Sequence, residues 1–180
     1  RGLGDVYKRQ GQNGHSPIIM VTSMNPGSGK TFITMNLATS LAIKGKKVLA
    51  IDLDLRKASL STYIQSPGKG VTNYLIGQVN TYNEVIVKGE THPNLDILPV
   101  GTIPPNPTEL LFESLLEQML SELKNQYDYI FIDCPPVEMV ADTSIINKYV
   151  DQTLFVIRAE LLERTMLPLS LIHISEPTRP

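Results

Sequence analysis

The chain has 180 residues, of which 42% are hydrophobic, and its 16 basic and 18 acidic residues give a formal net charge of −2 at pH 7. These values fit one globular domain with a sizeable core, and the slight acidity does not suggest a nucleic-acid partner. The single cysteine, Cys134, excludes an internal disulfide and fits a reducing cytosol. No apolar run approaches the roughly 18 residues expected of a membrane span.

The two ends of the chain are related at the level of DNA. Residues 1–10, RGLGDVYKRQ, and residues 169–178, LSLIHISEPT, can be encoded by opposite strands of one DNA segment. That segment resembles the transposase adapter used to prepare sequencing libraries; the alternative is a genuine inverted repeat in a gene. We therefore interpret residues 1–10 and 169–180 as adapter-derived and exclude them from reasoning about the fold. Residues 11–168 are expected to be one domain, truncated at both ends.

Apolar runs alternate with helical periodicity along residues 11–168. Residues 18–22 and 48–53 predict strands, and apolar side chains at helical spacing between them predict a helix. Lys44 and Gly45 predict the end of that helix. Prolines and glycines break the pattern between about residues 57 and 93, where few elements are predicted.

Three further strands are predicted over residues 95–100, 129–133 and 153–157. The segment PPNPTELL predicts a helix start, with Asn106 as the N-cap, Pro107 at the first helical position and Glu109 at the third. Apolar residues follow at helical spacing as far as Leu123, and a shorter helix is predicted over residues 142–149. The alternation indicates an α/β fold, a doubly wound and mostly parallel sheet with helices on both faces.

The stretch SMNPGSGKT, residues 23–31, lies between a predicted strand and a predicted helix, as a phosphate-binding loop does. It departs from the usual G-x-x-x-x-G-K-[ST] because Met24 replaces the first glycine. In such a loop glycines let backbone N–H groups approach phosphates, Lys30 reaches the β and γ phosphates, and the Thr31 hydroxyl can ligate Mg²⁺. The alternative is a glycine-rich turn that feeds a helix, but the flanking strand and helix favour a nucleotide site.

Aspartates follow two of the predicted strands, where open α/β folds bind ligands. In LAIDLDLR, residues 49–56, the alternation of a strand puts Asp52 and Asp54 on one face. Two carboxylates there could position Mg²⁺ or accept a proton from a hydroxyl, although an aspartate at a strand end often only caps a helix. In YIFIDCPP, residues 129–136, Asp133 supplies a further carboxylate.

The three motifs, together with NLDILPVGTIPPNPTELL, VADTSII and LFVIR, resemble the cytoplasmic domain of bacterial tyrosine autokinases, the BY-kinases of exopolysaccharide and capsule synthesis. The resemblance runs from about residue 18 to residue 168 and implies a P-loop NTPase fold that binds ATP and Mg²⁺. It implies catalytic roles for Asp52, Lys30 and Asp54, with Asp52 activating the tyrosine hydroxyl. It implies nucleotide binding by Asn25, Pro26, Gly27, Ser28, Gly29, Lys30, Thr31 and Arg158, and metal binding by Thr31, Asp54 and Asp133. The role of Arg56 stays open between phosphate contact and subunit contact.

The resemblance also implies a cellular role. The implied activity is that of a non-specific protein-tyrosine kinase that regulates polysaccharide polymerisation and export, and the implied location is the cytoplasmic face of the inner (plasma) membrane. The implied partners are a membrane-anchored chain-length-determinant domain or activator, upstream in the same chain or separate, further copies in a ring, and a phosphotyrosine phosphatase, with no nucleic acid. The family's acceptor tyrosines cluster in a C-terminal tail. Here the tyrosines of residues 11–168 are scattered, so this fragment is expected to be poorly active.

Two other functions compete with this one. Partition and septum-site ATPases share the fold but carry a lysine five residues before the loop lysine, where this chain has Asn25 followed by Pro26. A non-catalytic, nucleotide-dependent scaffold is the second alternative, and absence of the tyrosine tail from the intact gene would support it. His15 and His92 lack the spacing of zinc ligands, and Cys134 is expected to be a small strand-end residue and not a nucleophile.

Overall fold

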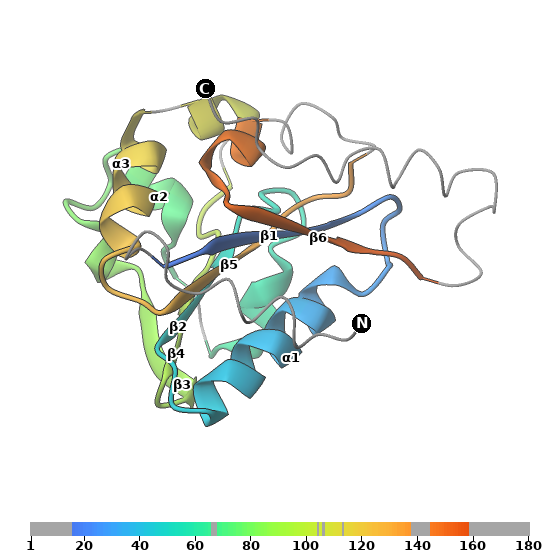
Figure 1. Cartoon of the computed structure of the whole chain (residues 1–180). Coiled ribbons are helices and arrows are strands. Elements are labelled where there is room, and N and C mark those ends of the chain that lie inside the picture. The colour runs from blue at the N-terminus through green and yellow to red at the C-terminus, as the bar shows by residue number, and fades with distance from the viewer. Residues whose placement is uncertain are drawn as a thin grey trace, which may run out of the picture.

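The computed structural model describes residues 16–65, 68–103, 105, 107–112, 114–137 and 145–158. Within them, one sheet has the strand order β3-β4-β2-β5-β1-β6 (Figure 1). Its strands are β1 (Ile18–Ser23), β2 (Val48–Asp52), β3 (Val87–His92), β4 (Leu95–Leu98), β5 (Tyr129–Asp133) and β6 (Gln152–Val156). The pairings are parallel except that of β3 with β4, which is antiparallel. The predicted mostly parallel sheet is confirmed.

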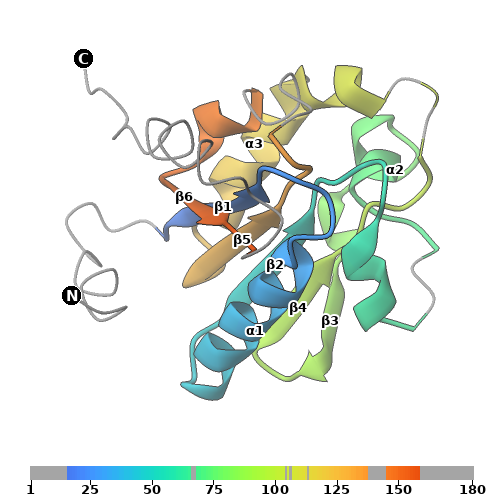
Figure 2. The same cartoon turned by 90° about the vertical axis from the view of Figure 1, so that its right-hand side faces the viewer.

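Helices cover both faces of the sheet, as Figures 1 and 2 show. Helix α1 (Lys30–Ile43) packs on the face that includes Val48 and Ala50. Helices α2 (Val71–Leu75) and α3 (Ser114–Leu123) pack on the other face, with Leu49 and Ile51. Successive residues of β2 therefore enter opposite cores, and this explains why its sequence is an unbroken apolar run. The predicted doubly wound α/β fold is confirmed.

The segment PPNPTELL does not open a continuous α-helix. Residues Pro107–Phe112 form a 3-10 helix, η5, and α3 begins at Ser114. The missing N–H of a proline needs no partner in the first turn of either kind of helix, and 3-10 turns are frequent at the start of α-helices. Leu111 is nevertheless fully buried, so the apolar positions of this segment still enter the core. The predicted N-cap, Asn106, lies outside the described residues.

The shorter helix predicted over residues 142–149 is seen only in its last part. Residues 145 and 146 are helical and lead into the 3-10 helix η6 (Asn147–Tyr149), while residues 142–144 lie outside the described residues. The two proposed adapter segments, 1–10 and 169–180, lie outside them too. None of the described helices is both long and apolar enough to cross a membrane.

The irregular region after β2 contains more elements than its sequence predicted. It holds the 3-10 helices η3 (Ser59–Tyr63) and η4 (Tyr82–Glu84), the short helix α2 and the strand β3. Strand β3 lies at the edge of the sheet and exposes most of its side chains. An edge strand of this kind has no apolar run, so the pattern that identified the other strands could not detect it.

Candidate nucleotide site

The carboxyl ends of β1, β2 and β5 meet at one edge of the sheet. The parallel register places Asp52, the last residue of β2, beside Asp133, the last residue of β5. The same register places Val21 of β1 beside Asp133. The loop that joins β1 to α1, visible in Figure 2, therefore starts next to both aspartates. Residues far apart in the sequence meet here because parallel strands end on the same side.

The loop between β1 and α1 is held by its own side chains. Ser23 Oγ and Ser28 Oγ both donate hydrogen bonds to the Asn25 carbonyl, at 2.8 and 2.7 Å. Gly27 and Gly29 have φ values of 77° and 88°, which other residues rarely adopt. The N-cap of α1 is Gly29, and no capping bond from a side chain is made there within the described part of the chain, so the N–H groups of the first turn can bind an anion. This is the geometry of a phosphate-binding loop.

Lys30 and Thr31 begin the helix, and both lie near Asp133. The Thr31 hydroxyl donates a hydrogen bond to Asp133 Oδ2 at 2.5 Å. Asp133 is 1% exposed, and its other oxygen, Oδ1, has no hydrogen-bond partner among the described residues. Burial raises the pKa of Asp133 to about 6, against the opposing effects of the Thr31 hydrogen bond and the Lys30 charge. A hydroxyl beside an unsatisfied carboxylate oxygen is a donor set suited to a hard divalent cation.

Asp52 is fully buried and accepts two backbone hydrogen bonds. The N–H of Asp54 reaches Oδ1 at 3.1 Å and the N–H of Leu60 reaches Oδ2 at 2.8 Å. Burial, followed by the charge of Asp133, raises the pKa of Asp52 to about 8, although the two N–H groups lower it. A carboxyl group with this pKa can exchange a proton near neutral pH.

The structure gathers the predicted charged and hydroxyl residues into one cluster. Asp52, Asp54 and Asp133 influence one another electrostatically, and Lys30 lies close enough to act on Asp133. Arg158 lies outside this cluster but reaches the loop, because its Nη1 donates to the Gly27 carbonyl at 3.2 Å. Within the described residues, no group of three or more His, Cys, Asp and Glu side chains is arranged to hold a metal ion by itself. A site for Mg²⁺ would need fewer, because Mg²⁺ keeps several waters and shares phosphate oxygens.

The other predicted residues of the loop differ in their exposure. Pro26, Gly27 and Gly29 are exposed, while Ser28 is buried and Asn25 lies between these extremes. Arg56 is exposed, and its position leaves its role open. The loop is therefore an accessible surface above a buried group of carboxylates.

The sequence did not indicate the contacts that fix the cluster. Thr22 Oγ1 donates to the Pro135 carbonyl at 2.8 Å, and the Val137 N–H donates to the Ser23 carbonyl at 2.8 Å. These bonds tie the segment after β5 to the end of β1. Each of these bonds, like that from the Leu60 N–H to Asp52, has a backbone group as one partner, and every residue offers such a group, so the sequence could not indicate which partner is used.

Cys134 and His92 have structural surroundings. Cys134 is fully buried, and burial raises its thiol pKa well above the usual value, helped by Asp133 and the neighbouring carboxylates. The thiol therefore stays protonated, as a small strand-end residue would. His92 Nδ1 accepts the Asn94 N–H at 3.1 Å within the β3–β4 turn.

Known proteins resemble the chain in sequence and fold. The signature of the AAA domain family matches residues 16–163. Tyrosine-protein kinase CpsD of Streptococcus agalactiae is 38% identical over 149 residues, which cover 82% of this chain and 63% of CpsD. The kinase domain of Escherichia coli tyrosine kinase ETK has a TM-score of 0.86 at 31% identity, covering 95% of this chain and 66% of that one. The chain thus spans about two thirds of CpsD and of the ETK kinase domain, but only 21% of the putative tyrosine-protein kinase EpsB of Ralstonia solanacearum, to which it is 37% identical.

The septum-site-determining protein MinD of Pyrococcus horikoshii, solved with Mg-ADP, is also similar. Its TM-score is 0.71 at 28% identity, covering 88% of this chain and 65% of that one. Both measures are lower than those of the ETK kinase domain. Because the AAA signature covers most of the chain and the tyrosine kinases match it better than MinD does, the chain belongs to the BY-kinase family of bacterial tyrosine kinases.

Proposed function

We propose that this chain is the nucleotide-binding domain of a protein-tyrosine autokinase, which transfers the γ-phosphoryl group of ATP to tyrosine in the control of exopolysaccharide or capsule synthesis. The observation that carries the proposal is the position of Asp133. It accepts the hydroxyl of Thr31 from the phosphate loop and lies beside Asp52 in the β2–β5 register. Asp133 therefore connects the phosphate loop to Asp52, the carboxyl group that can exchange a proton near neutral pH.

The residues present fit Mg²⁺. The unsatisfied Oδ1 of Asp133, the Thr31 hydroxyl and the buried carboxylate of Asp54 are all oxygen donors. We assign these three residues to the ion or its waters. When bound, Mg²⁺ would supply positive charge that neutralises the phosphate oxygens during transfer.

The remaining steps use residues of the chain itself. Lys30, at the start of α1, and the N–H groups of the loop bind the phosphates, and Arg158 supports the loop through the Gly27 carbonyl. The ionised form of Asp52 accepts the proton of the attacking tyrosine hydroxyl. The raised pKa makes this form a stronger base than an ordinary aspartate and leaves it the minor form at neutral pH. Positioning and electrostatic stabilisation supply most of the catalysis in phosphoryl transfer.

A partition or septum-site ATPase is the second candidate, and the likeness to MinD favours it. In that class the loop carries a lysine where this chain has Asn25. The Asn25 carbonyl accepts both loop serines, and Pro26 follows it. This loop therefore does not supply the lysine on which the second candidate depends.

The full-length parent protein tests the proposal. We expect Lys30→Met to abolish both ATP binding and phosphotyrosine, because the loop loses the cation that reaches the phosphates. Lys69→Met, at an exposed position, is the matched control and should retain both. Retained phosphotyrosine in Lys30→Met would overturn the kinase assignment. ATP hydrolysis without phosphotyrosine in the parent protein would instead support the partition type.

We further propose the setting of this activity. The parent protein would act at the cytoplasmic face of the plasma membrane with a membrane-anchored chain-length-determinant domain or activator, assemble into a ring, and be reversed by a phosphotyrosine phosphatase. The acceptor tyrosines would lie in a tail that these 180 residues do not contain. The isolated chain should therefore bind nucleotide but incorporate little phosphate.

A further inference from the structure

A groove lies at the opposite end of the parallel strands from the phosphate loop. Its volume is about 300 Å³, and the residues that line it include Lys47, Lys88, Gly89, Asp96, Gln126 and Tyr127. Lys47 immediately precedes β2, and Tyr127 lies two residues before β5. The groove is therefore at the amino ends of the same two strands whose carboxyl ends carry Asp52 and Asp133. Its volume is at the lower end of the range for small-molecule sites.

An irregularity in the edge strand shapes this groove. The pairing of β3 with β4 changes register between Val87 and His92, and Gly89 in between has a φ of 62°. The N–H of Gly89 donates to Asp96 Oδ1 at 3.0 Å, so a side chain of β4 holds the displaced backbone. Bulges of this kind re-aim strand residues and are frequent beside functional sites.

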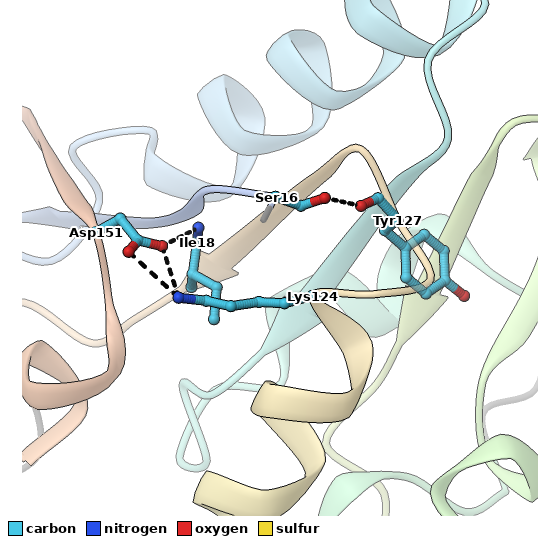
Figure 3. A network of polar contacts seen from close by, with 5 residues as sticks. All are labelled: Ser16, Ile18, Lys124, Tyr127 and Asp151. Atoms are coloured by element: carbon cyan, nitrogen blue, oxygen red, sulfur yellow. Dashed lines mark hydrogen bonds and ion pairs between the residues drawn. The ribbon is translucent and has the colours of Figure 1, made fainter. Parts of the chain in front are cut away.

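The inner wall of the groove is rigid and polar. Tyr127 is buried, and its hydroxyl donates to Asp96 Oδ2 at 2.7 Å. Both Asp96 oxygens are thus occupied by donors of the protein. Figure 3 shows the Tyr127 side chain extending away from Ser16, which bonds the Tyr127 carbonyl on the other side. The Lys47 ammonium lies 4.8 Å from the centre of the Tyr127 ring, which holds this cation against the groove.

Two ammonium groups of the groove are available to an anion. Lys47 and Lys88 are both exposed, and within the described part of the chain neither forms an ion pair with a carboxylate. The nearby carboxylates are held by other donors: Asp96 accepts the Gly89 N–H and the Tyr127 hydroxyl, and Asp128 accepts the backbone N–H of Lys47 at 2.7 Å. The amide of Gln126 adds a polar group at the same site and donates to the Tyr82 hydroxyl at 2.7 Å.

We propose that this groove binds a small anionic metabolite that carries a phosphate or carboxylate group, at a site separate from the phosphate loop. Lys47 and Lys88 pair with the anionic group, and the polar wall formed by Tyr127 and Gln126 contacts the rest of the ligand. Two lysines without competing ion pairs provide charge-assisted hydrogen bonds. The proposal does not depend on the kinase assignment, because none of its residues belongs to the nucleotide site.

Amide NMR titration of the ¹⁵N-labelled 180-residue chain separates the two sites. Inorganic phosphate and citrate serve as probes, with sodium chloride at matched ionic strength as the reference. We expect saturable shifts at Gly89 and Lys88 with at least one probe, whereas Gly27 and Gly29 report binding at the loop. Saturation by phosphate alone would identify the ligand as a phosphate ester, and saturation by citrate alone would identify it as a carboxylate. Saturation by both would support an anion-binding groove that accepts either group.

Variants complete the test. The double variant Lys47→Gln with Lys88→Gln should lower the affinity measured at Gly89 at least tenfold, while loop signals stay unchanged. Lys69→Gln, an exposed lysine away from the groove, is the control and should bind as the parent chain does. Both groove lysines are exposed, so their replacement leaves the core intact. Shifts that grow linearly, that match those in sodium chloride, or that persist in the double variant would overturn the proposal.

Discussion

The hydroxyl of Thr31 donates a hydrogen bond to Asp133 across 102 positions of sequence, at 2.5 Å. This contact links the first turn of α1 to the end of β5. It also satisfies one oxygen of a carboxylate that is 1% exposed, while the other oxygen has no partner within the described residues. A buried carboxylate held by a single hydroxyl is costly to maintain. The contact therefore affects both folding and the chemistry of the site.

Thr31→Val tests the structural side of this contact. The substitution keeps the shape of the side chain but leaves both oxygens of Asp133 without a protein donor. Loss of one partner of a buried polar group costs about 1–3 kcal/mol, and the pKa of Asp133 should rise further because the Thr31 hydrogen bond lowers it. Urea unfolding should show a lower midpoint with an unchanged slope. Ser40→Ala, which removes an exposed hydroxyl from the same helix, should change stability by less than about 0.5 kcal/mol; equal effects would contradict this interpretation.

The buried carboxyl groups predict an unusual dependence of stability on pH. The pKa of Asp52 is raised from 3.8 to about 8 and that of Asp133 to about 6. Between the unfolded and folded pKa values the folded chain binds more protons than the unfolded chain. Stability from these groups is therefore present at low pH and falls as pH rises from about 4 to 8. The free energy of unfolding without nucleotide or Mg²⁺ should be higher at pH 5.5 than at pH 8.

Asp52→Asn isolates the larger of these contributions. Asparagine resembles the protonated acid but cannot ionise, so the variant lacks the part of the pH dependence that comes from ionisation of the Asp52 carboxyl group. One unit of pKa shift corresponds to about 1.4 kcal/mol, and the stability advantage of the variant over the parent chain should grow by at least about that amount between pH 5.5 and pH 8, because the parent chain loses stability over this interval. Glu117→Gln, on the exposed side of α3, should leave the pH profile unchanged. A parallel profile for Asp52→Asn would show that Asp52 is ionised at neutral pH in the folded chain.

Much of the fold could be predicted because buried parallel strands leave a strong pattern. The apolar runs at residues 18–22, 48–53 and 129–133 match β1, β2 and β5 to within one residue at either end. The glycines of the loop were recognisable because the backbone conformations at Gly27 and Gly29 favour glycine. The residue types therefore indicated where the candidate nucleotide site lies.

The remaining features depend on long-range geometry. The register that places Asp52 beside Asp133 is a property of two strands separated by most of the domain. The N–H of Leu60 that holds Asp52 is a backbone group, and the bulge at Gly89 depends on the side chain of Asp96. None of these has a local sequence pattern. The groove, which combines the bulge with Tyr127, was for that reason not predicted at all.

Gly70 is required for a close approach between two loops. A Cβ atom there would lie 2.2 Å from the Pro99 carbonyl and 2.4 Å from the backbone of Val100 and Gly101. Backbone atoms cannot move aside cheaply, because the Val71 N–H donates to the same Pro99 carbonyl at 2.8 Å. Gly70→Ala should therefore cost about 3 kcal/mol, the upper end of overpacking effects. This corresponds to a fall in Tm of at least about 5 °C for a domain of this size.

Gly68→Ala is the matched control for this substitution, because a Cβ atom there would meet nothing within 4 Å. Thermal unfolding followed by circular dichroism measures both variants. The control should unfold within about 1 °C of the parent chain. Equal melting temperatures for both variants would show that the loops at Gly70 can separate without cost.

Asp151 anchors the start of β1, and Figure 3 shows its two partners. Its carboxylate accepts the Ile18 N–H at 2.8 Å and pairs with the Lys124 ammonium at 3.0 Å. The side chains of Lys124 and Asp151 are 25% and 46% exposed, so solvent screens the ion pair, which should contribute less than about 1 kcal/mol. The N–H bond to a charged acceptor contributes more, about 1.5–3 kcal/mol.

Asp151→Ala should therefore destabilise the chain by at least about 1.5 kcal/mol, and Lys124→Met by less than about 1 kcal/mol. Urea unfolding of both single variants and the double variant measures the coupling, and a coupling above about 1.5 kcal/mol would show that the ion pair, and not the N–H bond, holds this corner of the sheet.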